Sequence, residues 1–185
     1  LAMKIGYRVA DLKLAGKPVP AVLALAFRIA DRTVLRNIKI WLGLDRARLL
    51  GTGAAPVSPE LIRWYLALGL EMREIYGQTE CCGLATVMPA RKKLGSVGRA
   101  MPDTELRISE QGEILVRGPH VFKGYLNNPE KTAETVDRDG WLHTGDVGSV
   151  DEDGYVKITD RIKDIIITAG GKNITPSEIE NQLKF

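Results

Sequence analysis

The stretch from residue 140 to residue 171 constrains the fold more than any other part of the chain. It alternates short apolar runs with turn residues and charges. Val147–Val150 and Tyr155–Thr159 flank Asp153-Gly154, a dipeptide typical of tight turns between antiparallel strands. The pattern predicts a β-hairpin and therefore a β-rich region in this half of the chain.

Charged residues interrupt the apolar pattern directly after this hairpin. Positions 160–164 carry Asp160, Arg161, Lys163 and Asp164, and a second strand-like run follows at Ile165–Thr168. Unpaired buried charge is very costly. The interruption is therefore either an exposed linker or a place where a polar ligand meets these charges.

The first quarter of the chain predicts helices. Leu1–Leu14 mixes apolar and basic residues, and Gly16-Lys17-Pro18 breaks the pattern. Val19–Ile29 is apolar on nearly every side, which predicts a well-buried helix. Asp31–Leu42 has Val34, Leu35, Ile38 and Trp41 at helical spacing, and Gly43 should end it. We expect these helices to pack on a sheet.

The next segment alternates strand and helix. Ala47–Leu50 predicts a short strand, and a helix should begin after Ser58, with Ser58 as its cap and Pro59 at its first position. Glu71–Ile75 predicts a second strand. The expected apolar face of the helix consists of Leu61, Trp64, Tyr65 and Leu68.

Short strands with frequent glycine turns dominate from Gly95 onward. Thr104–Ile108 and Glu113–Arg117 predict a hairpin, and Asn128 should cap a short helix from Pro129 to about Thr135. This pattern suggests a small β-barrel or sandwich. A capping box at Thr175-Pro176-Ser177-Glu178 predicts a last helix.

The loop after the second predicted strand has the sequence Tyr76-Gly77-Gln78-Thr79-Glu80. It contains an aromatic ring, a hydroxyl and a carboxylate. Such a loop could stack a base, bond a phosphate and hold a metal. A plain turn is the alternative, and five residues do not decide between them. Upstream, Gly51-x-Gly53 alone is a weak nucleotide signal, because the full glycine-rich fingerprint is absent.

Composition excludes several classes. The net charge is +3 without a long basic stretch, so nucleic acid is not indicated. Cys81 and Cys82 are adjacent, which disfavours a disulfide and suits a reducing cytoplasm. The two histidines, His120 and His143, stand apart, so we expect no zinc site. Ala21–Phe27, the longest apolar run, is too short to span a bilayer, whereas surface association with a membrane stays open.

Several motifs in this order resemble the adenylate-forming superfamily, and in particular its long-chain fatty-acyl-CoA ligases. They are the loop at Tyr76–Glu80, TGD at Thr144–Asp146, DRIKD at Asp160–Asp164 and GGKNITPSEIE at Gly170–Glu180. The resemblance covers roughly residues 50 to 185. It implies an α/β fold: the C-terminal part of the large adenylate-forming domain, with a sheet layer and a small β-barrel, and the start of the small C-terminal α+β domain. The implied ranges are 1–94, 95–160 and 161–185.

The resemblance also implies roles for single residues. Gly53, Ala54 and Ala55 would lie along the adenine of ATP, with Tyr76 stacked on it and Ile158 near it. Gly77 and Gln78 belong to the same nucleotide loop, Thr79 would contact the α-phosphate, and Glu80 would ligate Mg²⁺. Asp146 would accept both ribose hydroxyls, and Arg161 would donate to the ribose or the phosphate.

Lys163 aligns with the hinge of the small domain, and Gly170 and Gly171 align with the channel for coenzyme A. The family's phosphate loop and its C-terminal catalytic lysine are not found between Leu1 and Phe185. We therefore expect a fragment that is not a competent enzyme by itself, cut from a cytoplasmic ligase that uses a fatty acid, ATP and coenzyme A. Peripheral association with the inner membrane surface and a homodimer are compatible with this expectation.

Two alternatives stay open. Another adenylate-forming enzyme, such as an aryl-CoA ligase or an amino-acid adenylation domain, would share the motifs. A β-rich binding module without enzymatic activity would treat TGD and DRIKD as surface turns. Nucleotide binding separates the second alternative from the others.

Overall fold

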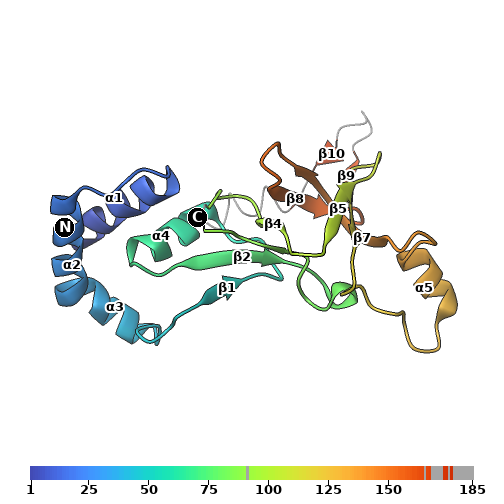
Figure 1. Ribbon diagram of the computed structural model, residues 1–185, viewed down its shortest axis with the longest axis horizontal. Helices are drawn as coiled ribbons and strands as arrows, with labels where there is room; N and C mark the ends of the chain where they lie inside the picture. Colours follow the sequence, from blue (N-terminus) through green and yellow to red (C-terminus); the bar gives the residue numbers. More distant parts are fainter. Residues whose placement is uncertain (91, 165, 168–172, 175, 177–185) are drawn as a thin grey trace. The chain divides into compact units, whose positions relative to one another are not determined.

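The computed structural model of the protein describes residues 1–90, 92–164, 166–167, 173–174 and 176. The chain divides into two compact units. Figure 1 labels their helices and strands. Unit 1 consists of Leu1–Thr52, Val57–Arg73 and Ala90–Leu94. Unit 2 consists of Gly53–Pro56, Glu74–Pro89 and the described residues from Gly95 onward. The ranges 1–94, 95–160 and 161–185 stay a prediction.

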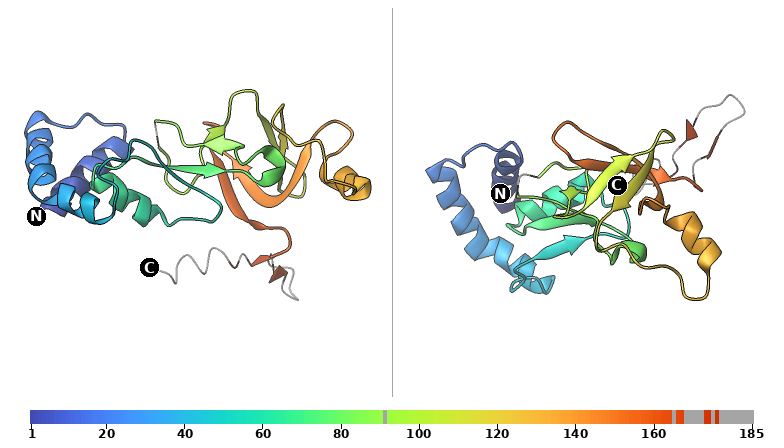
Figure 2. Two further views of the ribbon diagram at one scale, coloured as in Figure 1. Left: turned by 90° about the horizontal axis from the view of Figure 1, so that it is seen from below. Right: turned by 45° about the vertical axis from the view of Figure 1, so that its right-hand side comes forward.

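Unit 1 is mainly helical. Helix α1 spans Ala2–Leu14 and α4 spans Pro59–Ala67, and the two helices pack against each other. Gly6 is buried at this contact, and a Cβ there would collide with the backbone of Ala67. Helix α2 (Ala21–Ala30) runs through a π-helical turn (Asp31–Leu35) into α3 (Arg36–Trp41), so these residues form one continuous helix (Figure 2). The predicted helices of the first quarter, and the stop at Gly43 with its φ of +70°, are confirmed.

The prediction that the second helix is well buried is wrong. Val22, Leu25 and Ile29 are 81%, 59% and 58% exposed, and Ala30 is the only buried residue of α2. Only one side of α2 packs on the rest of unit 1, through Phe27 and Ala30. An apolar composition on every side of a helix does not specify which sides pack against other elements. Among the described residues, only one side of α2 does so.

The segment around α4 differs from its prediction in detail. Strand β1 spans Leu50–Thr52, so the predicted strand Ala47–Leu50 lies too early. The Oγ of Ser58 caps α4 by accepting from the N–H of Leu61 at 3.2 Å, as predicted. The most buried residues of α4, however, are Ile62, Leu66 and Ala67, which do not belong to the predicted apolar face. Of the residues predicted for that face, Leu68 alone is fully buried. The helix ends where Gly69 adopts a φ of +82°.

Strand β2 spans Met72–Tyr76 and leads from unit 1 into unit 2. It belongs to a four-stranded sheet of order β1-β2-β3-β4, in which β3 is Thr86–Val87 and β4 is Arg99–Ala100. A turn of 3-10 helix, Thr79–Cys81, connects β2 to β3. Tyr76 pairs with Thr86, so the loop between them starts and ends at neighbouring points of the sheet.

The larger sheet of unit 2 is antiparallel and has the order β5-β6-β7-β8. Its strands are Glu105–Ile108, Glu113–Arg117, Leu142–Val150 and Val156–Arg161. Both predicted hairpins are present, because β5 pairs with β6 and β7 pairs with β8. Among the described residues these four strands form an open sheet, which is the β-rich part that the glycine turns predicted.

Strand β8 continues through the first two charged residues of the predicted interruption. Val147 pairs with Asp160 and Asp146 pairs with Arg161, beyond an irregularity between Val147 and Gly148. The expected strand end at Thr159 is therefore wrong. The reason is the length of the partner strand. Strand β7 has nine residues, and β8 stays paired with it through Asp160 and Arg161 although these residues are charged. The turn comes at residues 162–164.

The core of unit 2 lies on one face of this sheet. It includes Ile114, Val116, Leu142, Val156 and Tyr76, all of which are at least 92% buried. Helix α5 (Pro129–Thr135) follows a long connection from β6 (Figure 2). The amide oxygen of Asn128 accepts from the N–H of Lys131 at 3.0 Å, so the predicted cap is confirmed.

Only short pieces are described after residue 164. Strand β9 (Ile166–Ile167) pairs antiparallel with β10 (Asn173–Ile174). The predicted strand Ile165–Thr168 thus contains β9, with its two end residues outside the described part. Gly170 and Gly171 also lie outside the described residues, as does the predicted helix after Thr175 apart from Pro176. No helix in the described part of the chain is long and apolar enough to cross a membrane.

Candidate functional site

The loop Tyr76–Glu80 folds tightly back on itself at the end of β2. Gly77 lies against the backbone of Gly83, where an added Cβ would come within 2.5 Å of the carbonyl oxygen. The N–H of Gln78 donates to the Sγ of Cys81 at 3.3 Å, which closes the 3-10 turn. Burial raises the pKa of the Cys81 thiol, so this sulfur stays protonated as a packing group. Cys81 is buried, whereas Cys82 is exposed.

A buried carboxylate lies beside the end of β2. The Tyr76 hydroxyl donates to Oδ2 of Asp146 at 2.7 Å, across 70 residues of sequence. The Nε of Arg161 lies 3.0 Å from the other carboxylate oxygen, Oδ1. The exposed fraction is 5% for Asp146 and 8% for Tyr76, whereas the Arg161 side chain is 62% exposed. The structure thus brings together three residues that the sequence predicted for one site.

The TGD sequence holds Asp146 in place through its own backbone. Gly145 has a φ of +72°, a conformation that favours glycine, and its N–H donates to Oε1 of Glu113 at 2.8 Å. The Thr144 hydroxyl donates to the Ile114 carbonyl at 2.7 Å and accepts from the Asp146 N–H at 3.1 Å. The carboxylate is therefore fixed by two neighbouring strands of one sheet.

The geometry leaves Asp146 able to accept further hydrogen bonds. An ionised carboxylate offers about four lone-pair positions, and Tyr76 and Arg161 occupy two of them. Burial, together with the negative charge of Asp146, raises the pKa of the Tyr76 phenol, which therefore remains a donor. A vicinal diol with its ends at the free positions would complete the set. The stacking role of Tyr76 stays a prediction, and little of its surface is open to a base.

Thr79 is exposed and Glu80 is half-buried at the start of the 3-10 turn. Oε1 of Glu80 accepts from the Tyr125 hydroxyl at 2.6 Å, while no described residue donates to Oε2. No group of three potential metal ligands occurs in the described part of the chain. A single carboxylate with a free oxygen fits Mg²⁺, which keeps several waters and shares the phosphates of its substrate. Glu80 could therefore hold the metal.

Gly53 approaches the end of β2 from another segment. An added Cβ there would come within 2.8 Å of both the Cγ1 and the carbonyl oxygen of Ile75. Ala54 has a φ of +65°, and Ala54 and Ala55 are exposed. Small residues thus let this backbone lie directly beside the strand that delivers Tyr76.

Two of the remaining predicted residues, Ile158 and Lys163, take no part in the hydrogen bonds described above for this site. Ile158 is on β8 and packs partly against the core of unit 2. Lys163 is exposed in the turn after β8, where the Asp164 N–H donates to the Arg161 carbonyl at 3.0 Å. The structure does not describe Gly170 and Gly171, so their predicted role falls outside the described residues.

Two residues near the site were not predicted. Tyr125 contacts Glu80 across 45 residues of sequence, and nothing in the local pattern indicates this contact. Glu74, two residues before Tyr76, is 8% exposed, and its Oε2 has no hydrogen-bonding partner among the described residues. Burial raises the pKa of Glu74 to about 7. The sequence signal for a buried carboxylate at Glu74 was its position within the predicted strand Glu71–Ile75.

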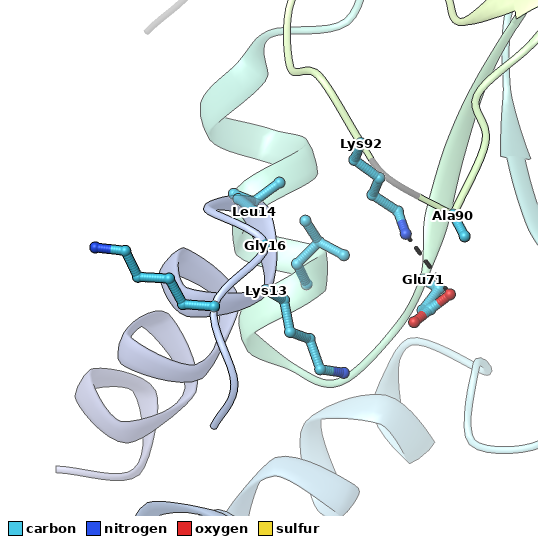
Figure 3. Close-up of a pocket in the computed structure, with 8 residues that line it drawn as sticks. Lys13, Leu14, Gly16, Glu71, Ala90 and Lys92 are labelled. Atoms are coloured by element: carbon cyan, nitrogen blue, oxygen red, sulfur yellow. Dashed lines mark ion pairs between the residues drawn. The ribbon is translucent and has the colours of Figure 1, made fainter. Parts of the chain in front are cut away.

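Two hollows in the surface of the described residues have other linings. One in unit 1, of about 300 Å³, has Lys92 paired with Glu71 at 3.6 Å and Lys13 at its wall (Figure 3). A more open one in unit 2 is lined by residues between Lys123 and Ala133. Neither is lined by a residue predicted for the nucleotide site. That assignment depends on the hydrogen bonds around Asp146.

Comparison with known proteins gives consistent matches. Residues 15–126 match the family described as AMP-binding enzyme. The chain is 42% identical over 183 residues to a putative fatty-acid–CoA ligase, fadD11, of Mycobacterium tuberculosis, which covers 98% of this chain and 32% of that protein. It is 44% identical over 164 residues to the long-chain-fatty-acid–CoA ligase ACSBG2 of Gallus gallus, covering 85% of this chain and 22% of that protein. The chain thus spans a third or less of the length of these curated relatives.

Solved structures show the same similarity. An O-succinylbenzoate coenzyme A synthetase (MenE) from Bacillus subtilis, in complex with ATP and a magnesium ion, is 32% identical with a TM-score of 0.68; the match covers 74% of this chain and 31% of that one. A fatty acyl CoA synthetase of Mycobacterium tuberculosis is 34% identical with a TM-score of 0.61, over 86% of this chain and 32% of that one. These neighbours agree with the predicted α/β class.

Proposed function

Because the chain belongs to the AMP-binding enzyme family, we propose that the full-length protein activates a carboxylic acid with ATP and transfers it to a thiol. The single observation that carries this proposal is the buried Asp146, held by Tyr76 and Arg161 beside the Tyr76–Glu80 loop. A fixed anion with free lone pairs is suited to the two hydroxyls of a ribose. The substrates are a fatty acid, ATP and coenzyme A, with Mg²⁺ as the metal.

The proposed reaction has two steps. The acid's carboxylate oxygen attacks the α-phosphorus of ATP. The bond between the α-phosphorus and the oxygen that bridges it to the β-phosphate breaks, and pyrophosphate leaves. The thiol of coenzyme A then attacks the acyl carbon, loses its proton and displaces AMP. The first step brings two anions together, so oriented donors and cations must stabilise its transition state. Mg²⁺ supplies charge neutralisation when bound.

The residues of this chain have separate roles in that scheme. Asp146 accepts from the ribose hydroxyls, and Arg161 donates its remaining N–H groups to the ribose or the α-phosphate. Thr79 donates its exposed hydroxyl to the α-phosphate. Glu80 would hold the metal, with Oε2 as its available oxygen. Gly53, Ala54 and Ala55 leave room for the adenine, with Tyr76, Gly77, Gln78 and Ile158 around it.

Lys163 has a role that differs from binding. It lies in an exposed turn directly after β8, at an element boundary where backbone rotation disturbs no strand. We assign it to the hinge about which the small C-terminal domain turns between the two steps. Gly170 and Gly171 line the thiol's channel in this proposal.

The choice of acid rests on the curated relatives, which are named as fatty-acid–CoA ligases. Among the structural neighbours are an O-succinylbenzoate coenzyme A synthetase and an anthranilate CoA ligase, so an aromatic acid is the second candidate. The names of the relatives with the higher sequence identities favour the fatty acid.

The proposal extends to where the protein works. Adjacent free cysteines suit a reducing cytoplasm. A long-chain acid resides in membranes, so we propose peripheral contact with the inner membrane surface. As a separate point, we propose that the protein forms a homodimer. Vesicle sedimentation and analytical ultracentrifugation of the full-length protein test these two points. Protein that stays in the supernatant and sediments as a monomer contradicts both.

The function is tested by ATP–pyrophosphate exchange with the full-length protein. Exchange should depend on a long-chain fatty acid, and added coenzyme A should then yield the acyl thioester, identified by mass spectrometry. Benzoate-type acids at the same concentration serve as the comparison. Exchange with aromatic acids alone would select the second candidate, and the absence of exchange with every acid would contradict the proposal.

A further inference from the structure

A tyrosine that the sequence motifs do not include fastens the carboxylate of Glu80. The Tyr125 hydroxyl donates to Oε1 of Glu80 at 2.6 Å. The N–H of Phe122 donates to the backbone carbonyl of Glu80 at 2.8 Å. The segment 122–125 therefore holds Glu80 at both its main chain and its side chain. A hydrogen bond to an ionised carboxylate is short and strong, and the distance observed here is of that kind.

The position of Tyr125 is itself fixed by α5. The Tyr125 N–H donates to the Oγ1 of Thr132 at 2.9 Å, and the Thr132 hydroxyl donates to the Asn128 carbonyl at 2.9 Å. The ring of Tyr125 packs edge-on against Phe122, with 4.8 Å between the ring centroids. Gly124 has a φ of +143°, and an added Cβ would come within 2.6 Å of Thr132. The phenol is thus anchored by the first turn of a capped helix.

The consequence for Glu80 is a carboxylate with two unequal oxygens. Oε1 is occupied by Tyr125, while Oε2 accepts no hydrogen bond from the described residues. Rotation of the carboxylate about its terminal bond would break the bond to Tyr125. The orientation of Oε2 is therefore set before any ligand arrives.

We propose that Tyr125 is a positioning residue, which orients the carboxylate of Glu80 so that Oε2 meets the Mg²⁺ that accompanies ATP. This inference rests on the proposed function, because it takes Glu80 as the metal's ligand. In this proposal Tyr125 acts only through its hydrogen bond to Glu80. Loss of a partner that orients a metal's ligand typically lowers the metal affinity by about 10- to 100-fold.

A role in packing alone makes a different prediction. A ring that only fills space against Phe122 would keep that role as phenylalanine. The hydroxyl is then the atom to remove, and Tyr125→Phe removes it while the ring stays. Leu126→Ala serves as the matched control, because Leu126 is the next residue of the same loop and is 92% exposed.

The test measures metal affinity directly in the full-length protein. Mn²⁺ is titrated in the presence of a non-hydrolysable ATP analogue and followed by electron paramagnetic resonance. We expect Tyr125→Phe to raise the Kd of Mn²⁺ by about 10-fold or more. The affinity for the analogue without metal, measured by calorimetry, should not change. Leu126→Ala should leave both values as in the wild type.

Glu80→Gln separates a failure of this inference from a failure of the proposed function. If Glu80→Gln weakens Mn²⁺ binding while Tyr125→Phe does not, Tyr125 has no positioning role and the metal role of Glu80 stands. If neither variant weakens it, the metal role of Glu80 fails and the inference fails with it. In the Glu80→Gln background, Tyr125→Phe should add nothing.

A second variant covers the case in which Tyr125→Phe does not fold, as judged by circular dichroism. Thr132→Val keeps the phenol but removes the hydroxyl that anchors the Tyr125 backbone. We expect it to raise the Kd of Mn²⁺ in the same direction by a smaller factor. A wild-type Kd in Thr132→Val would then overturn the inference.

Discussion

Removing the hydroxyl of Tyr76 should destabilise the protein by about 2 kcal/mol. This hydroxyl donates to Oδ2 of Asp146 at 2.7 Å, and both residues are more than 90% buried. A hydrogen bond to a charged group contributes roughly 1.5–3 kcal/mol to stability. In Tyr76→Phe the carboxylate keeps Arg161, whose side chain is 62% exposed and offsets little of the loss.

The effect is measured as a shift in thermal midpoint. For a chain of about 150–250 residues, 1 kcal/mol corresponds to roughly 2–4 °C, so Tyr76→Phe should lower the Tm of this chain by about 4–8 °C. Tyr7→Phe is the matched control. The Tyr7 ring packs under the Arg63 guanidinium at 4.7 Å, a contact that phenylalanine preserves, and its hydroxyl donates to no described residue. That control should change stability by less than about 0.5 kcal/mol.

A loss in Tyr76→Phe no larger than in Tyr7→Phe would refute this reasoning. It would mean that water or a rearranged Arg161 satisfies Asp146 as well as the phenol does. The carboxylate would then not be fixed in advance of its ligand, and its role in binding a ribose would lose its structural basis.

Three further predictions concern other parts of the chain. Burial raises the pKa of Glu74 to about 7 from 4.5, so the folded protein holds this proton more tightly than the unfolded chain, and stability should fall as the pH rises from about 4.5 through 7. Glu74→Gln should remove that decline, which we put at about 1–3 kcal/mol, as denaturant titrations at pH 5 and pH 8 would show; an unchanged pH dependence would contradict it. Gly98 has a φ of +89°, and an added Cβ would collide with the backbone of Val87 and Met88, so Gly98→Ala should cost more than about 3 kcal/mol or prevent folding, and a wild-type Tm would be the contrary result. Lys163→Pro fixes one backbone state at the proposed hinge, so thioester formation from preformed acyl-AMP should fall more than pyrophosphate exchange; equal losses in a folded variant would count against a hinge.

Local patterns predicted local structure well. The caps at Ser58 and Asn128, the hairpin at Asp153-Gly154 and the helix stop at Gly43 each depend on a few adjacent residues, and each is confirmed. Such signals are readable because the side chain that caps a helix, or the residue with a positive φ, acts within four positions of itself.

Features that depend on distant partners were mispredicted or missed. The charges at Asp160 and Arg161 suggested the end of a strand, yet β7 carries β8 through both residues. The apolar composition of α2 suggested burial, yet only one of its sides meets the rest of unit 1. In both cases the deciding factor is a neighbour elsewhere in the sequence, which composition and periodicity do not contain.

The candidate site shows the same division. The motifs supplied Tyr76, Asp146 and Arg161, and the structure joins them by direct contacts. The contact between Tyr125 and Glu80 could not be predicted, because it depends on how the loop before α5 returns to the end of β2. The roles of these residues toward a nucleotide stay proposals.

The central claim, that Asp146 binds the ribose of ATP, is tested most directly by comparing ATP with 2′,3′-dideoxy-ATP. Their affinities are measured by calorimetry for the full-length wild type and for Asp146→Ala. Two hydrogen bonds to a charged group, each contributing roughly 1.5–3 kcal/mol, predict that the wild type binds the dideoxy nucleotide at least about 100-fold more weakly than ATP. Asp146→Ala should bind the two nucleotides with similar affinity. An equal loss for the dideoxy nucleotide in both proteins would show that the ribose hydroxyls do not bind Asp146.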